Sequence, residues 1–346
     1  MKKSLNRRKF IGASLIASAG LALKSNKIWG APNYIPSLFK PNSKINGVQL
    51  GMITYSFREM EDQSAEATLK NVLECNISAI ELMGDVADTF AGAPKNPINL
   101  RKYYRFMRGN MGGTLTQDQK NEMKEMEKEI KAYNEIKSKW RENSSMKAIE
   151  KLRKMYNDAG VSIYAFKPSR LLGPKNTDAE IKWAMLAGKT LGASHVTVEH
   201  TKDEALTLKL GQIAKQLDVF VAYHGHEQQT PVLWDTVLKQ SSNNAINLDL
   251  GHYVAAGNTE PLQILKDHHK EIKSIHIKDR QNPENGKKNM SFGKGDTPII
   301  EALQLIRDKK YNFPATIEYE YETPENSTII AEIQKCVEYC TKALQS

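Results

Sequence analysis

Four acid or histidine side chains lie at the ends of four strand-like apolar runs in the second half of this chain. If these runs are parallel strands of one closed sheet, their carboxyl ends share one edge, and the four side chains converge there. Three carboxylates and one imidazole around a point can bind a divalent metal ion. The four residues are Glu199, Asp249, His276 and Glu318.

The predicted ligand types indicate both the metal and its chemistry. Carboxylates are hard ligands that suit Mn²⁺, Mg²⁺ or Co²⁺, and the set is also compatible with Zn²⁺. Four protein ligands leave positions open for substrate oxygens, so the metal can act as a Lewis acid on a carbonyl. The carbon next to that carbonyl then loses a proton more readily, through an enediolate. Glu199 and Glu318 are the candidate catalytic bases, because the fourth and eighth strands of a barrel lie across from each other.

Histidines are concentrated at the same predicted edge. A single histidine or glutamate after a strand is usually a buried structural residue or a solvated one, but the chain has eight histidines in all. Five of them lie at predicted strand ends, and this clustering favours a metal or acid–base site. Beside His276 these are His200, His224, His226 and His252.

Further polar residues at this edge are candidates for substrate binding. Lys167, Lys278 and Arg280 can contact an anion or donate hydrogen bonds to hydroxyl groups. Together with His224, His226 and His252 they form the predicted substrate-binding set. Glu81, near the end of the second apolar run, is either a further substrate contact or a solvated strand-end residue.

Apolar strand-like runs and segments of helical period alternate from residue 47 to the C-terminus, and these elements must position the candidate residues. Segments of helical period separate most of the apolar runs, for example Asp178 to Leu191 and residues 327–344. Eight strand–helix units in about 300 residues predict an α/β fold, a (β/α)8 TIM barrel in a single domain. A doubly wound open sheet would show an early glycine-rich phosphate turn, which is missing. The eight runs are 47–54, 77–83, 161–166, 194–199, 218–223, 245–250, 272–277 and 314–319.

Residues 95–155 interrupt this rhythm after the second run. The stretch Gln117 to Trp140 is highly charged and has a helical pattern, which predicts a helical insertion. Because the insertion follows a strand end, it belongs to the active-site end of the barrel. The sequence leaves open whether it covers the pocket mouth or is a solvated helix without a functional role.

The first thirty residues are expected to be an export signal. A basic segment with the pair Arg7-Arg8 precedes an apolar run from Ile11 to Leu23, which is too short to span a bilayer. Asn-Arg-Arg-Lys-Phe-Ile is similar to a twin-arginine motif, which predicts export by that machinery to a bacterial periplasm, with no stable membrane anchor. Residues 31–46, rich in Pro, Asn, Ser and Lys, are predicted to be a linker, and 47–346 the barrel.

The signal also accounts for most of the chain's positive charge. Residues 1–30 hold seven basic residues and no acidic one, so the formal net charge falls from +9 to +2 without them. This near-neutral remainder argues against nucleic acid as a partner. The sparse cysteines, Cys75, Cys336 and Cys340, are interpreted as buried apolar residues rather than a disulfide framework.

In this order and spacing, the motifs resemble the xylose isomerase-like TIM barrel superfamily, in its sugar phosphate isomerase/epimerase branch, over about residues 47–344. The matching pieces are D-x-x-H at Asp249–His252, H-x-H at His224–His226, H-x-K-D at His276–Asp279 and G-x-G-D at Gly293–Asp296. The resemblance implies metal ligands at Glu199, Asp249, His276 and Glu318, and substrate contact by His252. It implies a carbohydrate isomerase or epimerase that works through an enediolate.

Three departures from the family affect the expected substrate: the export signal, the 95–155 insertion and the lack of an evident sugar-phosphate cluster. Phosphorylated intermediates stay in the cytoplasm, so we expect a small-molecule carbohydrate that is not phosphorylated. Members of this branch include lyases, and a periplasmic lyase or hydratase that cleaves 3-keto-glycosides by β-elimination on the same metal site is the alternative. The sequence leaves homo-oligomer formation open.

Two other classes of protein share this fold. A DNA-repair endonuclease would need three zinc ions and further histidine ligands, which the ends of the first three runs do not supply. A non-catalytic carbohydrate-binding barrel is the other alternative, and loss of a metal ligand would be its simplest sign. All four predicted ligands are present in the sequence.

Overall fold

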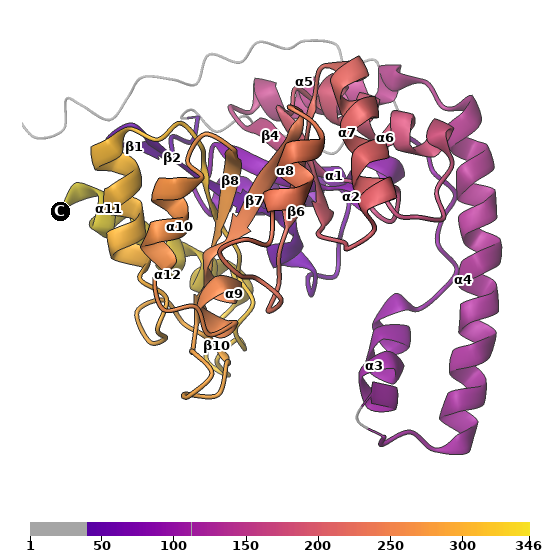
Figure 1. The fold of residues 1–346 in the computed structure, drawn as a ribbon. Coiled ribbons are helices and arrows are strands. Elements are labelled where there is room, and N and C mark those ends of the chain that lie inside the picture. The colour runs from indigo at the N-terminus through magenta and orange to yellow at the C-terminus, as the bar shows by residue number, and fades with distance from the viewer. Residues whose placement is uncertain (1–39, 112) are drawn as a thin grey trace, which may run out of the picture. The chain divides into compact units, whose positions relative to one another are not determined.

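The chain forms a closed barrel of eight parallel strands, as the sequence predicts (Figure 1). This computed structural model describes residues 40–111 and 113–346. The barrel closes where β2 pairs with β3 on one side and with β11 on the other. Its strands are β2 (Val48–Ile53), β3 (Ala79–Met83), β4 (Ser162–Lys167), β5 (His195–Glu199), β6 (Phe220–His224), β7 (Asn244–Asp249), β8 (Ile272–Ile277) and β11 (Ala315–Ile317).

Three short strands lie outside the barrel. Strand β1 (Lys44–Ile45) lies within the segment predicted to be a linker and pairs antiparallel with β2. Strands β9 (Asp279–Arg280) and β10 (Asn289–Met290) form an antiparallel pair immediately after β8. They therefore belong to the same end of the barrel as the carboxyl ends of the strands.

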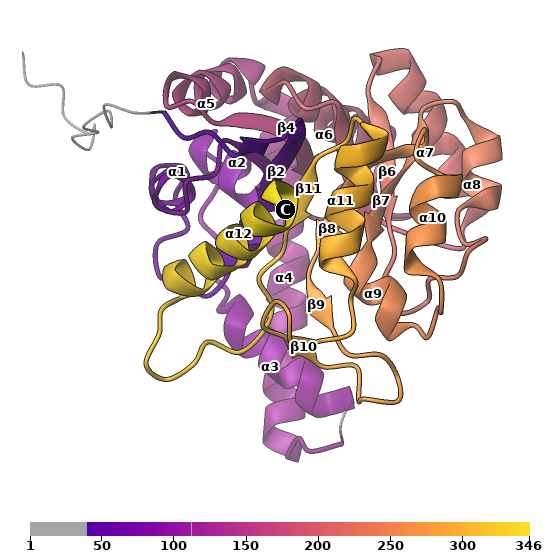
Figure 2. The ribbon, with the colours of Figure 1, turned by 90° about the vertical axis from the view of Figure 1, so that its left-hand side faces the viewer.

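Helices follow the strands and surround the barrel (Figures 1 and 2). Their apolar faces pack on the outward faces of the strands in one continuous core. The helices are α1 (Ala65–Glu74), α2 (Gly84–Phe90), α3 (Leu100–Met111), α4 (Gln117–Asn143), α5 (Met146–Asp158), α6 (Asp178–Leu191), α7 (Glu204–Leu217), α8 (Asp235–Gln240), α9 (Leu250–Ala255), α10 (Pro261–Asp267), α11 (Ile299–Lys309) and α12 (Ile329–Gln345), with a 3₁₀ turn at Thr54–Phe57.

The interior of the barrel is polar, in contrast to the apolar shell between strands and helices. The Tyr164 hydroxyl bonds to Thr316 Oγ1 at 2.7 Å, across the barrel from its own strand. Gly51 makes room for this ring, because a Cβ there would lie 2.5 Å from the Tyr164 hydroxyl oxygen. His195, which is fully buried, bonds to Ser274 Oγ at 2.9 Å. Inward positions are thus used for hydrogen bonds rather than for aliphatic packing.

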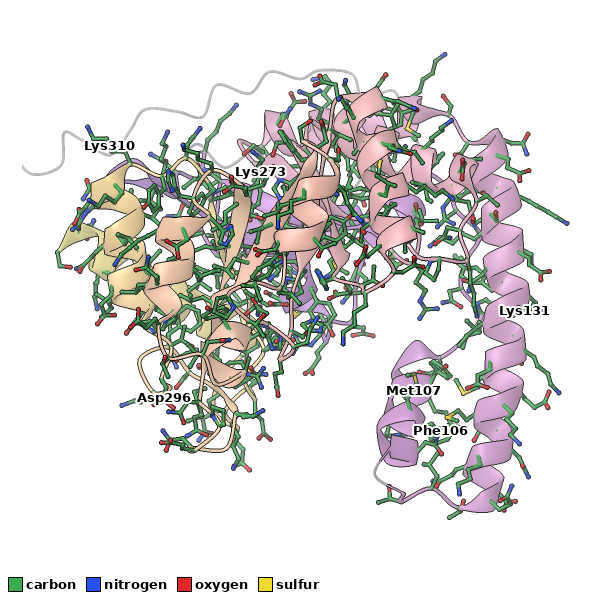
Figure 3. The ribbon with its side chains drawn as sticks, viewed as in Figure 1. Phe106, Met107, Lys131, Lys273, Asp296 and Lys310 are labelled. Atoms are coloured by element: carbon green, nitrogen blue, oxygen red, sulfur yellow. The ribbon has the colours of Figure 1, made fainter. Side chains whose placement is uncertain are left out.

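Helices α3 and α4 form a hairpin between β3 and α5. In Figures 1 and 2, α3 and the N-terminal half of α4 extend past the barrel at the end where α9 and β10 lie. This is the end at which the barrel strands finish, since Lys273 at the start of β8 lies at the other end (Figure 3). Residue Phe106 lies between the two helices and is buried with Met123 and Met126 in a small separate core (Figure 3).

The C-terminal half of α4 is attached to the barrel by a buried ion cluster. Asp88 on α2 accepts from Lys137 Nζ at 2.7 Å and from Arg141 Nη2 at 2.8 Å. Lys137 also contacts the exposed Asp85, at 3.1 Å. We call these four residues the insertion cluster. Its two cations and two carboxylates are balanced in charge, and they attach the insertion to the barrel.

Other sequence predictions fall partly or wholly outside the described residues. The export signal at 1–30 and the linker up to residue 39 lie there. Among the described residues, no helix has both the length and the apolar character needed to cross a membrane.

Candidate metal centre

Asp249, the last residue of β7, occupies the centre of the predicted site and is fully buried. Its Oδ1 accepts a hydrogen bond of 2.7 Å from the backbone N–H of His252 and so caps the N-terminus of α9. Its Oδ2 lies 3.1 Å from Lys278 Nζ, but not along a hydrogen-bond direction. One carboxylate oxygen is therefore fixed by the helix, and the other points into the barrel with a cation nearby and no hydrogen bond among the described residues.

His276 on β8 is fixed between two buried carboxylates. Its Nδ1 lies 2.9 Å from Glu318 Oε2, and its Nε2 lies 2.8 Å from Glu81 Oε2. Burial acts to lower the pKa of His276, but the charges of Glu81 and Glu318 outweigh it and raise that pKa to about 10. Glu81 is itself positioned by Thr197, whose hydroxyl donates to its other oxygen at 2.6 Å.

Lys278, two residues after His276 and directly past the end of β8, contacts three carboxylates. Its ammonium group is 3.1 Å from Asp249 Oδ2, 2.9 Å from Glu318 Oε2 and 2.6 Å from Glu320 Oε2. Only 3% of this residue is exposed. Burial acts to lower the pKa of Lys278, but the neighbouring Asp249 and Glu318 raise it above its usual value.

His224, at the end of β6, directs an unprotonated nitrogen toward Asp249. The Asn247 amide donates through its nitrogen to Ser274 Oγ at 2.7 Å, so its oxygen accepts from His224 Nδ1 at 2.6 Å. Nδ1 then carries the proton, and Nε2, which lies 3.9 Å from Asp249 Oδ2, has a free lone pair. Burial lowers the pKa of His224 to about 3, which keeps the ring neutral.

His226 and His252 form a second group with His224 at the rim. The rings of His226 and His252 are 4.5 Å apart between centroids, and the three side chains are close enough to share an ion. His252 Nδ1, however, accepts a hydrogen bond from the Arg280 guanidinium, so its other nitrogen carries the proton while the ring is neutral. This arrangement suits His252 to donating a hydrogen bond to substrate better than to binding a metal.

Glu199, predicted as the fourth ligand, makes no ion pair or hydrogen bond with the other three among the described residues. Its carboxylate is half-exposed and pairs with Lys167 Nζ at 2.7 Å and, at 3.5 Å, with His226 Nε2. Burial acts to raise the pKa of Glu199, but His224 and Lys167 outweigh it and lower that pKa to about 2. Of the predicted ligands, the structure thus brings together Asp249, His276 and Glu318, with Glu199 at the rim beside them.

The three predicted anion-binding cations are all engaged by carboxylates. Lys167 pairs with Glu199, and Lys278 with the three carboxylates described above. Arg280 Nη2 lies 2.8 Å from Glu227 Oε1, and its guanidinium also donates to His252. Their charges are therefore largely neutralised by the protein itself.

The H-x-K-D and G-x-G-D motifs meet in a single loop contact. Asp279 Oδ2 accepts backbone hydrogen bonds of 2.8 Å from Gly293, 3.1 Å from Lys294 and 2.9 Å from Gly295. Gly295 has to be a glycine, because a Cβ there would lie 2.3 Å from Asp279 Oδ1. Asp279 thus holds the loop after β10 against the rim of the site.

Sequence reasoning left the role of Glu81 open and did not single out Asn247 or Glu320. The structure places Glu81 in full burial against His276, so it is not a solvated strand-end residue. Asn247 lies two residues before Asp249 on β7, where side chains two apart point to the same face, and this period of two could have identified it. Glu320 lies two residues after Glu318, beyond the end of β11.

The donor set fits a divalent metal ion. His224, Asp249 and His276 each direct a ligand atom to a common point, these atoms lying within 4.8 Å of one another, and all three residues are buried. Four carboxylates, Glu81, Asp249, Glu318 and Glu320, surround one ammonium group and one imidazole, which leaves an excess of negative charge. A further cation would offset this excess, and mixed imidazole and carboxylate donors suit a transition metal such as zinc, manganese or cobalt.

Comparison with known proteins agrees with the barrel fold. The family model described as xylose isomerase-like TIM barrel matches residues 133–340. No curated protein matches the chain by sequence. Three solved structures share the fold at low identity, which supports the architecture alone.

The first is a sugar phosphate isomerase/epimerase from Parabacteroides distasonis, with 16% identity and a TM-score of 0.54, covering 87% of this chain and 96% of that one. The second is the probable 3-DHS dehydratase AsbF from Bacillus anthracis, with 14% identity, a TM-score of 0.54 and coverage of 86% and 99%. The third is the IOLI protein with a bound zinc atom, with 15% identity, a TM-score of 0.53 and coverage of 86% and 98%. Because the family model matches more than half of its length, the chain belongs to the xylose isomerase-like TIM barrel family, whose members are mostly isomerases, epimerases and dehydratases.

Proposed function

We propose that this protein is a metal-dependent enzyme that removes a proton next to a carbonyl group of a non-phosphorylated sugar or sugar derivative, as an isomerase or epimerase does. The observation that carries the proposal is the convergence of Asp249, His276 and Glu318 at the carboxyl ends of three barrel strands. Asp249 Oδ2 has no hydrogen bond among the described residues, although it is buried, and such an oxygen is a strong metal ligand. The zinc atom named for the IOLI structure supports a metal ion in a protein of this fold.

Asp249, His276 and Glu318 would hold the metal, with His224 as a further ligand from β6. When bound, the metal would polarise the substrate carbonyl and stabilise the negative charge that develops on its oxygen. Glu81 holds the His276 ring through Nε2, and Nδ1, which faces Glu318 Oε2 at 2.9 Å, would have to release its proton to bind the metal.

Glu199 is the proposed proton acceptor. Its carboxylate is half-exposed at the rim, and Lys167 holds one of its oxygens at 2.7 Å. The pKa of Glu199 lies at about 2, so the carboxylate is ionised at neutral pH, although pairing with Lys167 makes it a weaker base than an unpaired glutamate. His226, 3.5 Å from the other oxygen, is placed to pass that proton on to solvent or to the product. Glu318 is the candidate on the opposite side, and His276 and Lys278 hold its carboxylate.

The pairing of the rim cations supports a substrate without a phosphate group. A phosphate-binding site uses cations that the protein leaves available to the ligand. Here Lys167, Lys278 and Arg280 already have carboxylate partners. Hydroxyl groups of a free sugar or glycoside need only hydrogen bonds, which these residues and His252 can donate.

The predicted export signal bears on where in the cell the proposed enzyme acts. We propose that the twin-arginine machinery carries the folded protein to the periplasm and that its substrate is a carbohydrate found there. Export and activity are tested separately, and the test of activity does not depend on the first thirty residues.

The test measures exchange of a substrate proton with solvent as well as formation of product. Purified protein without residues 1–30 is incubated in D₂O with Mn²⁺, Co²⁺ or Zn²⁺ and with free ketohexoses or 3-keto-glycosides. The expected result is deuterium uptake at the carbon next to the carbonyl, lost on addition of EDTA. An inverted centre or a shifted carbonyl identifies an isomerase or epimerase, and a released aglycone identifies the lyase.

Two variants separate binding from proton transfer. Glu199→Gln is expected to bind metal like the wild type and to lose at least about a hundredfold in exchange rate, as the removal of a general base does. Glu227→Gln, which alters another rim glutamate, is the matched control and should exchange normally. Wild-type protein that binds metal but exchanges no proton on any of these sugars would refute the enzyme proposal in favour of a carbohydrate-binding barrel.

A further inference from the structure

Lys278 shares its partners with the candidate metal. Asp249 Oδ2 and Glu318 Oε2, the two oxygens that face His276 Nδ1 at 3.8 and 2.9 Å, are the same two atoms that contact the Lys278 ammonium. A metal bound between Asp249, Glu318 and His276 would draw on both oxygens. Two cations that use the same two oxygens repel each other strongly in a buried site.

The stem of Lys278 is fixed, so only its end can move. The side chain packs against α9 at Gly251, where an added Cβ would lie 2.4 Å from Lys278 Cγ and 2.8 Å from the Lys278 carbonyl oxygen. This contact prevents the stem from leaving its position toward α9. The ammonium can still shift between its three carboxylates by rotation of the terminal bonds.

Glu320 offers the ammonium a position outside the ligand set. Its Oε2 lies 2.6 Å from Lys278 Nζ, the shortest of the three contacts, and its side chain is 20% exposed. Unlike Asp249 and Glu318, this carboxylate has no contact with His276 among the described ion pairs. An ammonium held by Glu320 alone leaves the other two carboxylates free for a metal.

We propose that Lys278 is a tethered cation that competes with the metal ion for Asp249 and Glu318, and that Glu320 holds its ammonium when the metal binds. This inference rests on the proposed metal-dependent function and adds a device that sets metal affinity. Lys278 and Glu320 then have opposite effects on metal affinity. Lys278 lowers it by occupying Asp249 and Glu318, and Glu320 raises it by holding the ammonium away from those two carboxylates.

Metal affinity measured by titration calorimetry, with Mn²⁺ and Zn²⁺ on chelator-treated protein, tests the proposal. Lys278→Met keeps the length of the stem and removes the charge, and it should bind metal at least about tenfold more tightly, as relief of a direct charge competition predicts. Glu320→Gln should bind several-fold more weakly, because the ammonium then remains on Asp249 and Glu318. Lys137→Met, which removes a buried lysine from the insertion cluster, is the matched control and should leave metal affinity unchanged.

Two further readouts exclude a general effect of charge or of folding. The gain in metal affinity of Lys278→Met should persist at high salt. A long-range electrostatic effect on metal affinity, such as that of Lys167→Met, would be screened. Lys278→Met should have a lower Tm than the wild type without metal, and metal should raise its Tm by more. A residue that merely supports the fold would lower Tm equally in both conditions.

The outcomes separate this inference from the proposed function. If the wild type binds metal and Lys278→Met binds it equally or more weakly, Lys278 is a support for the ligands and the inference is wrong. If Lys278→Met does not fold, unchanged or tighter binding by Glu320→Gln overturns it instead. If neither the wild type nor any variant binds metal, the proposed metal-dependent function itself fails.

Discussion

Two ion clusters in this molecule are built from similar residues but differ in the balance of positive and negative charge. In the insertion cluster, Asp85 and Asp88 face Lys137 and Arg141, two charges of each sign. In the barrel, the four carboxylates Glu81, Asp249, Glu318 and Glu320 surround Lys278 and His276. The first cluster is complete without a ligand and holds α4 to α2. The second has an excess of carboxylate, which is costly to bury unless a cation joins it.

The contrast between the two clusters separates a structural ion cluster from a binding site. Burial and short distances are common to both. What separates them is an unsatisfied ligand atom together with unmatched charge, found here at Asp249 Oδ2 and its surroundings. Asp88 Oδ1 also lacks a hydrogen bond among the described residues, but its carboxylate has two cations on the other oxygen.

The largest effect is expected from Asp249→Asn, which removes the ligand charge at the centre of the barrel cluster. The loss of metal affinity should exceed the roughly 10- to 100-fold typical of outer-shell changes. Asparagine can still cap α9, so the fold should persist. Calorimetric metal titration and circular dichroism measure the two effects. Metal binding as tight as in the wild type would mean that the barrel cluster is structural, like the insertion cluster.

Asp88→Ala should have the next largest effect, on stability alone. It leaves Arg141 buried without its carboxylate partner and Lys137 with only the exposed Asp85, and breaking such a buried pair costs about 3–5 kcal/mol. Urea unfolding measures the loss. Asp85→Ala is the control and should cost at most about 1 kcal/mol, because Asp85 is exposed. Weakened metal binding in the Asp88 variant would show that the two clusters are coupled.

Acidification is expected to act on the barrel interior through His195. Burial lowers the pKa of His195 from 6.5 to about 4 in the folded protein. The unfolded chain therefore binds more protons between these values, and stability falls as the pH drops through that window, by about 3 kcal/mol at most. His195→Gln should reduce the slope of unfolding free energy against pH from 6.5 to 4. An identical slope in both proteins would assign the acid sensitivity to other groups.

The smallest expected effect belongs to Glu81→Gln, which keeps a hydrogen-bond acceptor for His276 Nε2 and removes one charge. Partners that orient a metal-binding histidine typically contribute 10- to 100-fold in affinity, so a loss toward the lower end, about tenfold, is expected. Metal titration measures it. Thr68→Ser, a conservative change at another buried polar residue, on α1, is the control. Tighter binding in Glu81→Gln would mean that the excess of negative charge does not attract the metal.

Much of the fold could be predicted because each strand and each helix has a pattern of apolar residues that is contained in one short segment of the chain. All eight predicted apolar runs became barrel strands, and the helix predicted at Asp178 to Leu191 has those bounds in the structure. The site was harder, because its geometry depends on contacts between strands. Glu199 occupies the strand-end position expected of a ligand, yet it pairs with Lys167 at the rim.

The strands, their parallel order and the end of the barrel at which Asp249, His276 and Glu318 meet could be predicted from the sequence, because alternation and strand-end position are properties of one segment at a time. Three contacts follow from the folded barrel: Glu81 supports His276, the ammonium of Lys278 shares the ligand oxygens, and Glu199 pairs with Lys167. The pairing of charges depends on distances between strands far apart in the chain. Such distances follow from closure of the barrel and not from any local pattern.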